Sequence, residues 1–139
     1  MNVNDLDTPH LVVDLDGMED NLNRYQAYFD EHGIGLRPHI KTHKCLAIAH
    51  MQMARGAIGI TCQKLGEAEV MVNGGVDEDV LIPFNIIGEQ KLRRLVALTK
   101  RTKLTVAADS EYTIRGLSEA TSKAGVEVGV VIELDVGGR

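Results

Sequence analysis

Residues 103–135, KLTVAADSEYTIRGLSEATSKAGVEVGVVIELD, contain the pattern that decides the fold. The apolar runs at 103–108 and 126–135 are typical of strands, and the residues between them have a helical period. Ser110 is a good N-cap for a helix over 110–124, and Gly125 is a typical stop after its last turn. A strand, a helix and a second strand in this order predict a βαβ unit with parallel strands.

The same alternation extends towards the N-terminus. Further strands are predicted at 11–16, 34–41, 57–62 and 79–85, and further helices at 17–32, 43–55, 65–73 and 88–101. The first strand is not followed by a Gly-rich dinucleotide fingerprint, which favours a (β/α)₈ barrel over a Rossmann sheet. The five units after residue 33 cannot close an eight-stranded barrel. We therefore expect an α/β fold that is either an open sheet or the first part of a TIM-type barrel. The chain ends directly after a strand, which favours the front of a longer protein.

Composition and charge exclude several classes of protein. The chain has 139 residues, 44% hydrophobic and 25% charged, as expected for a globular domain. A net charge of −5 argues against nucleic acid and against an anionic membrane surface as partners. The apolar stretches are too short to span a membrane, and the N-terminus has no secretory signal. Two cysteines are too few for a disulfide scaffold. We expect a cytoplasmic protein.

The stretch RPHIKTHK at residues 37–44 is the densest polar cluster. It follows a predicted strand, and α/β barrels place their catalytic groups at the C-terminal ends of strands. A lysine at such a position, here Lys41, can be desolvated, which makes its neutral amine available for a Schiff base. The alternative is a solvated basic turn. His39 and His43 do not share a helical face, because the helix begins only near His43, and we predict no metal site here.

Other polar residues also end predicted strands. Gln63 follows the second strand and could hydrogen-bond a ligand at the barrel mouth, whereas Cys62 before it is interpreted as a small buried hydrophobe. Asn85 and Asp109 are expected at the same rim, although Asp109 could simply belong to the start of the next helix. Arg139 follows two glycines after the last strand.

Four stretches together resemble one known family. DTP at 7–9, LRPHIKTHK at 36–44, GITCQK at 59–64 and ELDVG at 133–137 resemble the D-threonine aldolase and D-serine dehydratase family. The resemblance covers nearly the whole chain, and the 36–44 stretch is its specific part. It implies an alanine-racemase-type (β/α)₈ barrel that binds pyridoxal 5'-phosphate (PLP), followed by a β-domain absent from this chain. Residues 17–139 would be the first part of the barrel, and a strand within 1–16 would join the β-domain.

The resemblance also implies the site. Lys41 matches the Schiff-base lysine, His39 is expected to shape the site, and Gln63 and Arg139 match places that line the cofactor. A divalent metal, zinc or manganese, would be held by residues near the C-terminus of the full protein, outside this chain. A homodimer is expected, because barrels of this type commonly complete each active site with the partner's C-terminal domain.

The implied activity is that of a lyase on D-β-hydroxy amino acids. An aldolase, which cleaves the Cα–Cβ bond to give glycine and an aldehyde, is favoured by the residues around 44–45 and 62–64. A D-serine or D-threonine dehydratase and an amino-acid racemase of the same superfamily are the alternatives. Two alternatives are not enzymes: a non-catalytic PLP-binding protein and a structural fragment without activity.

Overall fold

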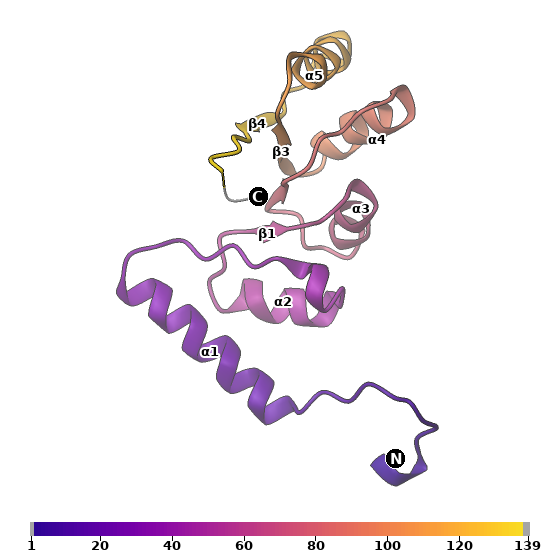
Figure 1. Cartoon of the computed structure of the whole chain (residues 1–139). Coiled ribbons are helices and arrows are strands. Elements are labelled where there is room, and N and C mark those ends of the chain that lie inside the picture. The colour runs from indigo at the N-terminus through magenta and orange to yellow at the C-terminus, as the bar shows by residue number, and fades with distance from the viewer. Residues whose placement is uncertain (1, 138–139) are drawn as a thin grey trace.

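The computed structural model describes residues 2–137 and shows strands that alternate with helices along the chain (Figure 1). Four strands form one parallel sheet in the order β1-β2-β3-β4, so each strand pairs with the next one in the sequence. The strands are β1 (Ile60–Thr61), β2 (Asp79–Ile82), β3 (Lys103–Ala108) and β4 (Gly129–Ile132). The helices are α1 (Leu15–Glu31), α2 (Leu46–Ala54), α3 (Leu65–Asn73), α4 (Glu89–Thr99) and α5 (Glu111–Ala124), with short 3₁₀ turns η1 (Val3–Asp5) and η2 (Ile40–Thr42).

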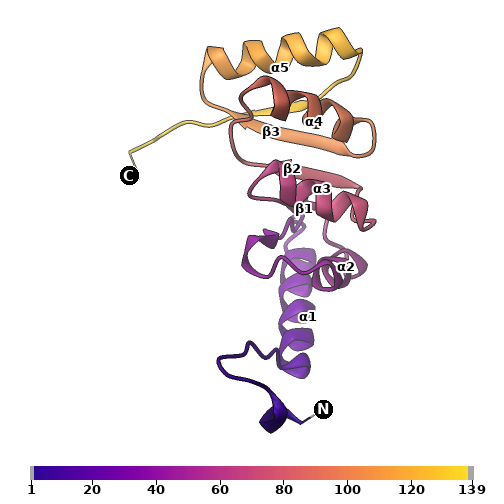
Figure 2. The same ribbon diagram turned by 90° about the vertical axis from the view of Figure 1, so that its right-hand side faces the viewer.

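The core lies between the sheet and the row of helices that covers one of its faces (Figure 2). Alternate strand residues such as Val80 and Ile82 are fully buried in this layer. They pack with apolar residues of the helices, of which Met71, Leu95 and Leu117 are among the largest buried side chains. This layered arrangement confirms the α/β class and the parallel βαβ units predicted from the sequence.

The unit with the clearest sequence pattern is also the best predicted. Strand β3 covers 103–108, as expected. Ser110 is the N-cap of α5, and its side chain accepts a hydrogen bond from the N–H of Thr113 at 3.4 Å. Gly125 ends the helix with a φ of +63°, a conformation in which a residue without a Cβ is favoured.

The predicted strand at 11–16 is wrong for this chain. Residues 11–14 form no strand, because no neighbouring strand among the described residues pairs with them, and Leu11 is 89% exposed. Helix α1 already begins at Leu15, since the Asp14 side chain accepts a hydrogen bond from the N–H of Gly17 at 3.0 Å and caps it. Pairing of the N-terminal segment with a C-terminal β-domain stays a prediction.

The predicted strand at 34–41 is reduced to a parallel bridge between His39 and Thr61. Its carbonyls at Leu36 and Pro38 accept hydrogen bonds from the next segment, but Pro38 has no N–H to give in return. Helix α2 begins at Leu46 instead of 43. The preceding 3₁₀ turn and the positive φ of Lys44, +47°, keep residues 43–45 out of the helix.

The last strand is also shorter than predicted, Gly129–Ile132 instead of 126–135. Its side chains Val130, Val131 and Ile132 are 41–59% exposed, since β4 is the edge of the sheet in this chain. No helix among residues 2–137 has the length and apolar character needed to cross a membrane.

An ion-pair network ties the N-terminal edge of the sheet together. Asp79, the first residue of β2, pairs with Arg37 at 2.9 Å and with Lys103 of β3 at 2.7 Å. Burial alone would raise the pKa of Asp79, but the hydrogen bonds from these two cations hold it below its ordinary value. The Arg37 guanidinium reaches Asp79 across Gly59, where a Cβ would collide with both residues.

Gly59 has a φ of +151°, so both its backbone and its surroundings require glycine. We expect Gly59→Ala to lower the free energy of unfolding by about 2–3 kcal/mol. Gly116→Ala is the matched control, because Gly116 lies inside α5 and a Cβ there meets only Leu92 at an ordinary 3.6 Å. The control should be neutral or stabilise by up to about 1 kcal/mol. Chemical denaturation of the full-length protein measures both, and equal effects would contradict this account.

Candidate functional site

Loops after successive parallel strands meet at one rim of the sheet, because parallel strands all end at the same edge. The turn with Lys41 follows the segment bridged to β1, and Gln63 follows β1 itself. Asn85 follows β2 and Asp109 follows β3. The rim predicted from the sequence is therefore present, and it is assembled from residues about 70 positions apart in the chain.

Lys41 lies in the middle of the 3₁₀ turn η2, next to the fully buried Ile40. Ile40 anchors the turn in the core, and Lys41 itself is exposed. His39 is the N-cap of this turn, and its Nδ1 accepts a hydrogen bond from the backbone N–H of Lys41 at 3.3 Å. Within residues 2–137, no carboxylate lies within ion-pair distance of the Lys41 ammonium. The lysine is held by its backbone and leaves its amine accessible.

Glu67, in the first turn of α3, connects two parts of this rim. One of its carboxylate oxygens accepts a hydrogen bond from the Gln63 N–H at 2.8 Å, and the other is 3.0 Å from the Lys44 Nζ. Its side chain is only 9% exposed. Burial by itself would raise the pKa of Glu67, but Gln63 and Lys44 together hold it below its ordinary value. The carboxylate is therefore charged at neutral pH.

Sequence reasoning did not single out Glu67. The signal was there, because a glutamate at the third position of a helix commonly accepts a hydrogen bond from a backbone N–H before that helix. Here the N-cap is Lys64 and the accepting oxygen reaches one residue further back, to Gln63.

His43 is a structural residue in this turn. Its Nδ1 accepts a hydrogen bond from the Cys45 N–H at 3.0 Å. Burial lowers the pKa of His43, more than its hydrogen bonds raise it, so the ring is neutral at pH 7. Among the described residues, no group of three or more His, Cys, Asp or Glu side chains is arranged to hold a metal ion.

The Asn85 side chain donates to Asp109 Oδ2 at 2.7 Å, which joins the loops after β2 and β3. The Oδ1 atom of Asn85 is buried and has no hydrogen-bond partner within residues 2–137. A cavity of about 470 Å³ opens beside these groups, between the loops after β1 and β2 and helix α4. Gln63 and Asn85 both line it, together with the cationic residues Lys64, Lys91 and Arg94, whereas Lys41 does not.

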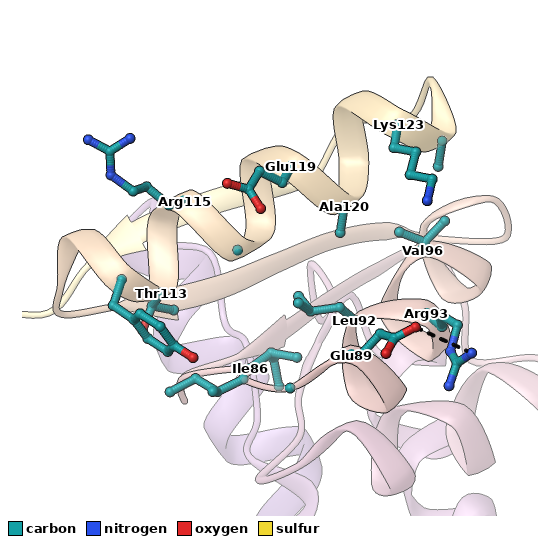
Figure 3. A pocket seen from close by; sticks show the side chains of 15 residues that line it. Ile86, Glu89, Leu92, Arg93, Val96, Thr113, Arg115, Glu119, Ala120 and Lys123 are labelled. Atoms are coloured by element: carbon teal, nitrogen blue, oxygen red, sulfur yellow. Dashed lines mark ion pairs between the residues drawn. The ribbon is translucent and has the colours of Figure 1, made fainter.

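A larger groove of about 880 Å³ lies elsewhere, between α4 and α5. Leu92 and Val96 of α4 face Ala120 of α5 across it (Figure 3). Neither Lys41 nor Gln63 lines this groove. Its size therefore does not make it the candidate site.

Two arginines of the sequence analysis are not part of the described rim. Arg37 belongs to the polar stretch around Lys41, but its guanidinium pairs with Asp79 at the opposite edge of the sheet. Arg139, predicted to line the cofactor, lies outside the described residues. The described candidate site thus contains Lys41, His39 and Gln63, supported by Glu67.

The fold and the rim together define the class of protein. The chain belongs to the family described as alanine racemase, N-terminal domain, whose model matches residues 13–139. This confirms the alanine-racemase-type architecture expected from the resemblance.

Individual proteins of known name are similar to nearly the whole of this chain. The chain is 42% identical over 132 residues to a D-threonine aldolase of Arthrobacter sp., covering 95% of this chain and 35% of that protein. It is 35% identical to a D-threo-3-hydroxyaspartate dehydratase of Delftia sp. (strain HT23), covering 96% of this chain and 35% of the relative. The crystal structure of a D-threonine aldolase from Filomicrobium marinum matches with a TM-score of 0.94 and 45% identity, over 99% of this chain and 37% of that one. The chain thus spans about a third of the length of these relatives.

Cys62 provides a test of the packing at the rim. It is fully buried at the end of β1, and burial, with a smaller effect of the Glu67 charge, raises the pKa of its thiol to about 12. At pH 8 this leaves about a thousandfold less thiolate than an ordinary thiol would have. We expect iodoacetamide to modify the partly exposed Cys45 in the folded full-length protein and to spare Cys62.

Peptide mapping by mass spectrometry before and after denaturation distinguishes the two thiols. Denaturation should make Cys62 as reactive as Cys45. Equal modification of both cysteines in the folded protein would show that Cys62 is not buried as described.

Proposed function

We propose that this chain is the N-terminal part of a PLP-dependent lyase that acts on D-β-hydroxy amino acids, with Lys41 as the residue that binds the cofactor. The observation that carries the proposal is the position of Lys41. Lys41 is exposed, and no carboxylate of the described residues forms an ion pair with it. It lies at the rim formed by the C-terminal ends of the strands in an alanine-racemase-type fold. The names of the relatives, a D-threonine aldolase and a D-threo-3-hydroxyaspartate dehydratase, support the substrate class.

The residues at the rim fit this cofactor. Lys41 offers an amine on a turn whose backbone is fixed by His39 and Ile40. Gln63 and Asn85 border a cavity, and the buried Oδ1 of Asn85, which has no hydrogen-bond partner among the described residues, can accept a hydrogen bond from a ligand. An aldehyde-bearing, polar aromatic ring suits this set of groups.

Each residue of the proposed site would have its own role. PLP, when bound, stabilises negative charge at the substrate Cα. Lys41 would supply the amine that holds the cofactor and then gives way to the amine of the substrate. His39 would keep the backbone of Lys41 in place, and the side chains of Gln63 and Arg139 would line the cofactor.

Within this class we propose the aldolase reaction, which gives glycine and an aldehyde. The support is the identity of 42% to the Arthrobacter aldolase, against 35% to the Delftia dehydratase. Dehydration is the second candidate, because that dehydratase is similar over 96% of this chain.

Three further properties belong to this proposal. The full protein would use a divalent metal, zinc or manganese, held by residues outside this chain. One solved structure of a D-threo-3-hydroxyaspartate dehydratase mutant is described as the metal-free form, which supports metal use in such relatives. We also propose a homodimer and a cytoplasmic location for the full protein.

Reductive trapping tests the central residue. With PLP, the full-length protein should turn yellow, and borohydride should fix the cofactor to Lys41. Lys41→Ala should abolish the adduct, because the exposed amine that forms it is gone. Lys64→Ala is the matched control, since Lys64 is an exposed lysine at the neighbouring strand end, and it should keep the adduct. Mass spectrometry of the peptides locates the cofactor, and an adduct that survives Lys41→Ala would overturn the assignment.

Product analysis tests the reaction. D-Threonine should yield glycine and acetaldehyde, and removal of divalent metal by a chelator should abolish turnover until zinc or manganese is added back. Formation of 2-oxobutanoate would favour the dehydratase, and L-allothreonine, the product of inversion at Cα alone, would indicate a racemase. Full activity after thorough chelation would contradict the metal-assisted lyase, and bound PLP without turnover of any D-β-hydroxy amino acid would favour a non-catalytic PLP-binding protein.

A further inference from the structure

We propose that Glu67 is a positioning residue that fixes the turn with Lys41 relative to Gln63 and thereby sets how tightly the cofactor is held. The proposal rests on the proposed function of Lys41. It adds a residue of α3 that acts through Lys44 and Gln63 and need not touch the cofactor.

The geometry places Glu67 between the two loops. Lys44 comes three residues after Lys41 and follows His43, the C-cap of η2, and its Nζ is 3.0 Å from Glu67 Oε1. The N–H of Gln63 points to the other oxygen at 2.8 Å. One carboxylate therefore holds the end of the Lys41 turn and the start of the Gln63 loop at a fixed separation.

The backbone of Lys44 indicates that this contact constrains the turn. Lys44 is the only non-glycine residue among 2–137 with a positive φ, +47°. Such a conformation is unfavourable for a residue with a Cβ, so other interactions must offset it. The N–H of Lys44 donates to the Ile40 carbonyl at 2.8 Å, and its ammonium pairs with Glu67. Without the carboxylate, Lys44 loses its ion pair and keeps the backbone hydrogen bond to Ile40.

An ion pair away from the candidate site offers a comparison. Glu89, the first residue of α4, is 3.6 Å from Arg93 of the same helix. Both residues line the groove between α4 and α5 and neither lines the cavity beside Gln63. Loss of a negative charge in general would have the same effect at both glutamates, whereas a positioning role separates them.

The test is a PLP titration of the full-length protein, followed by the yellow absorbance. Glu67→Gln keeps the shape and an acceptor for the Gln63 N–H but loses the charge that pairs with Lys44. We expect it to raise the Kd for PLP about tenfold, and Glu89→Gln to change it less than about twofold. Thermal unfolding of both variants serves as the control for folding.

A pH titration of the same absorbance gives a readout that general destabilisation would not move. Glu67→Gln leaves the Lys44 ammonium, three residues from Lys41 in the chain, without its counter-charge, and an added positive charge disfavours a protonated linkage at Lys41. The midpoint of the absorbance change should therefore shift to lower pH. The double variant Lys44→Gln, Glu67→Gln removes the unbalanced charge and should return the midpoint towards that of the unmodified protein.

If Glu67→Gln does not fold, Lys44→Gln tests the same ion pair from its other side. Lys44 is exposed, so its substitution should not prevent folding. It should raise the Kd for PLP to a similar extent, and combining both substitutions should not weaken binding much further. An unchanged Kd and pH midpoint in Glu67→Gln, with PLP still bound at Lys41, would overturn this inference alone. A protein that takes up no PLP at Lys41 would overturn the proposed function and this inference together.

Discussion

The hydrogen bond from the Thr61 N–H to the Pro38 carbonyl, 2.8 Å long, is the contact on which the candidate site depends. It aligns the segment before η2 in parallel with β1, although that segment is too irregular to form a strand. Because the alignment is parallel, the segment ends at the same edge as the strands, and Lys41 follows at the rim. An antiparallel or unpaired segment would leave Lys41 away from Gln63.

The two ends of the parallel strands carry polar groups with different functions. At the N-terminal edge, Arg37, Asp79 and Lys103 form a closed set of ion pairs around a position that only glycine can occupy. At the C-terminal edge, polar groups such as Asn85 Oδ1 still have bonding capacity. Satisfied charges stabilise the fold, whereas accessible groups can bind a ligand. The short stretch from Arg37 to Lys41 contributes to both edges, which explains its density of polar residues.

The parts of the fold that were predicted correctly are those in which local signals agree. Strand β3 and helix α5 have an apolar run, a capping serine and a terminal glycine, and each lies within a residue of its predicted bounds. The segment at 11–14 misled the prediction because an apolar run indicates a strand only where a partner strand is available. The start of α2 was misplaced because the left-handed backbone of Lys44 has no signature in sequence.

In the candidate site, too, local sequence signals predicted some residues and missed others. Lys41, His39 and Gln63 were predicted as site residues from their place after strands and from the resemblance, and they lie in successive segments that end at the same rim. Glu67 was missed because its importance comes from contacts between loops that lie about 20 residues apart, which no local pattern reveals.

The similarity to two kinds of lyase limits which part of the catalytic reaction this segment can serve. An aldolase and a dehydratase are both similar to the chain over about 95% of its length, although their names denote different bond cleavages. A segment that two reactions have in common must supply what both require. Holding the cofactor is such a requirement, whereas the choice between a carbon–carbon and a carbon–oxygen bond is not. Under the proposed function, Lys41 and the groups that position it serve this common step, and the choice of bond would then depend on other groups of the full protein.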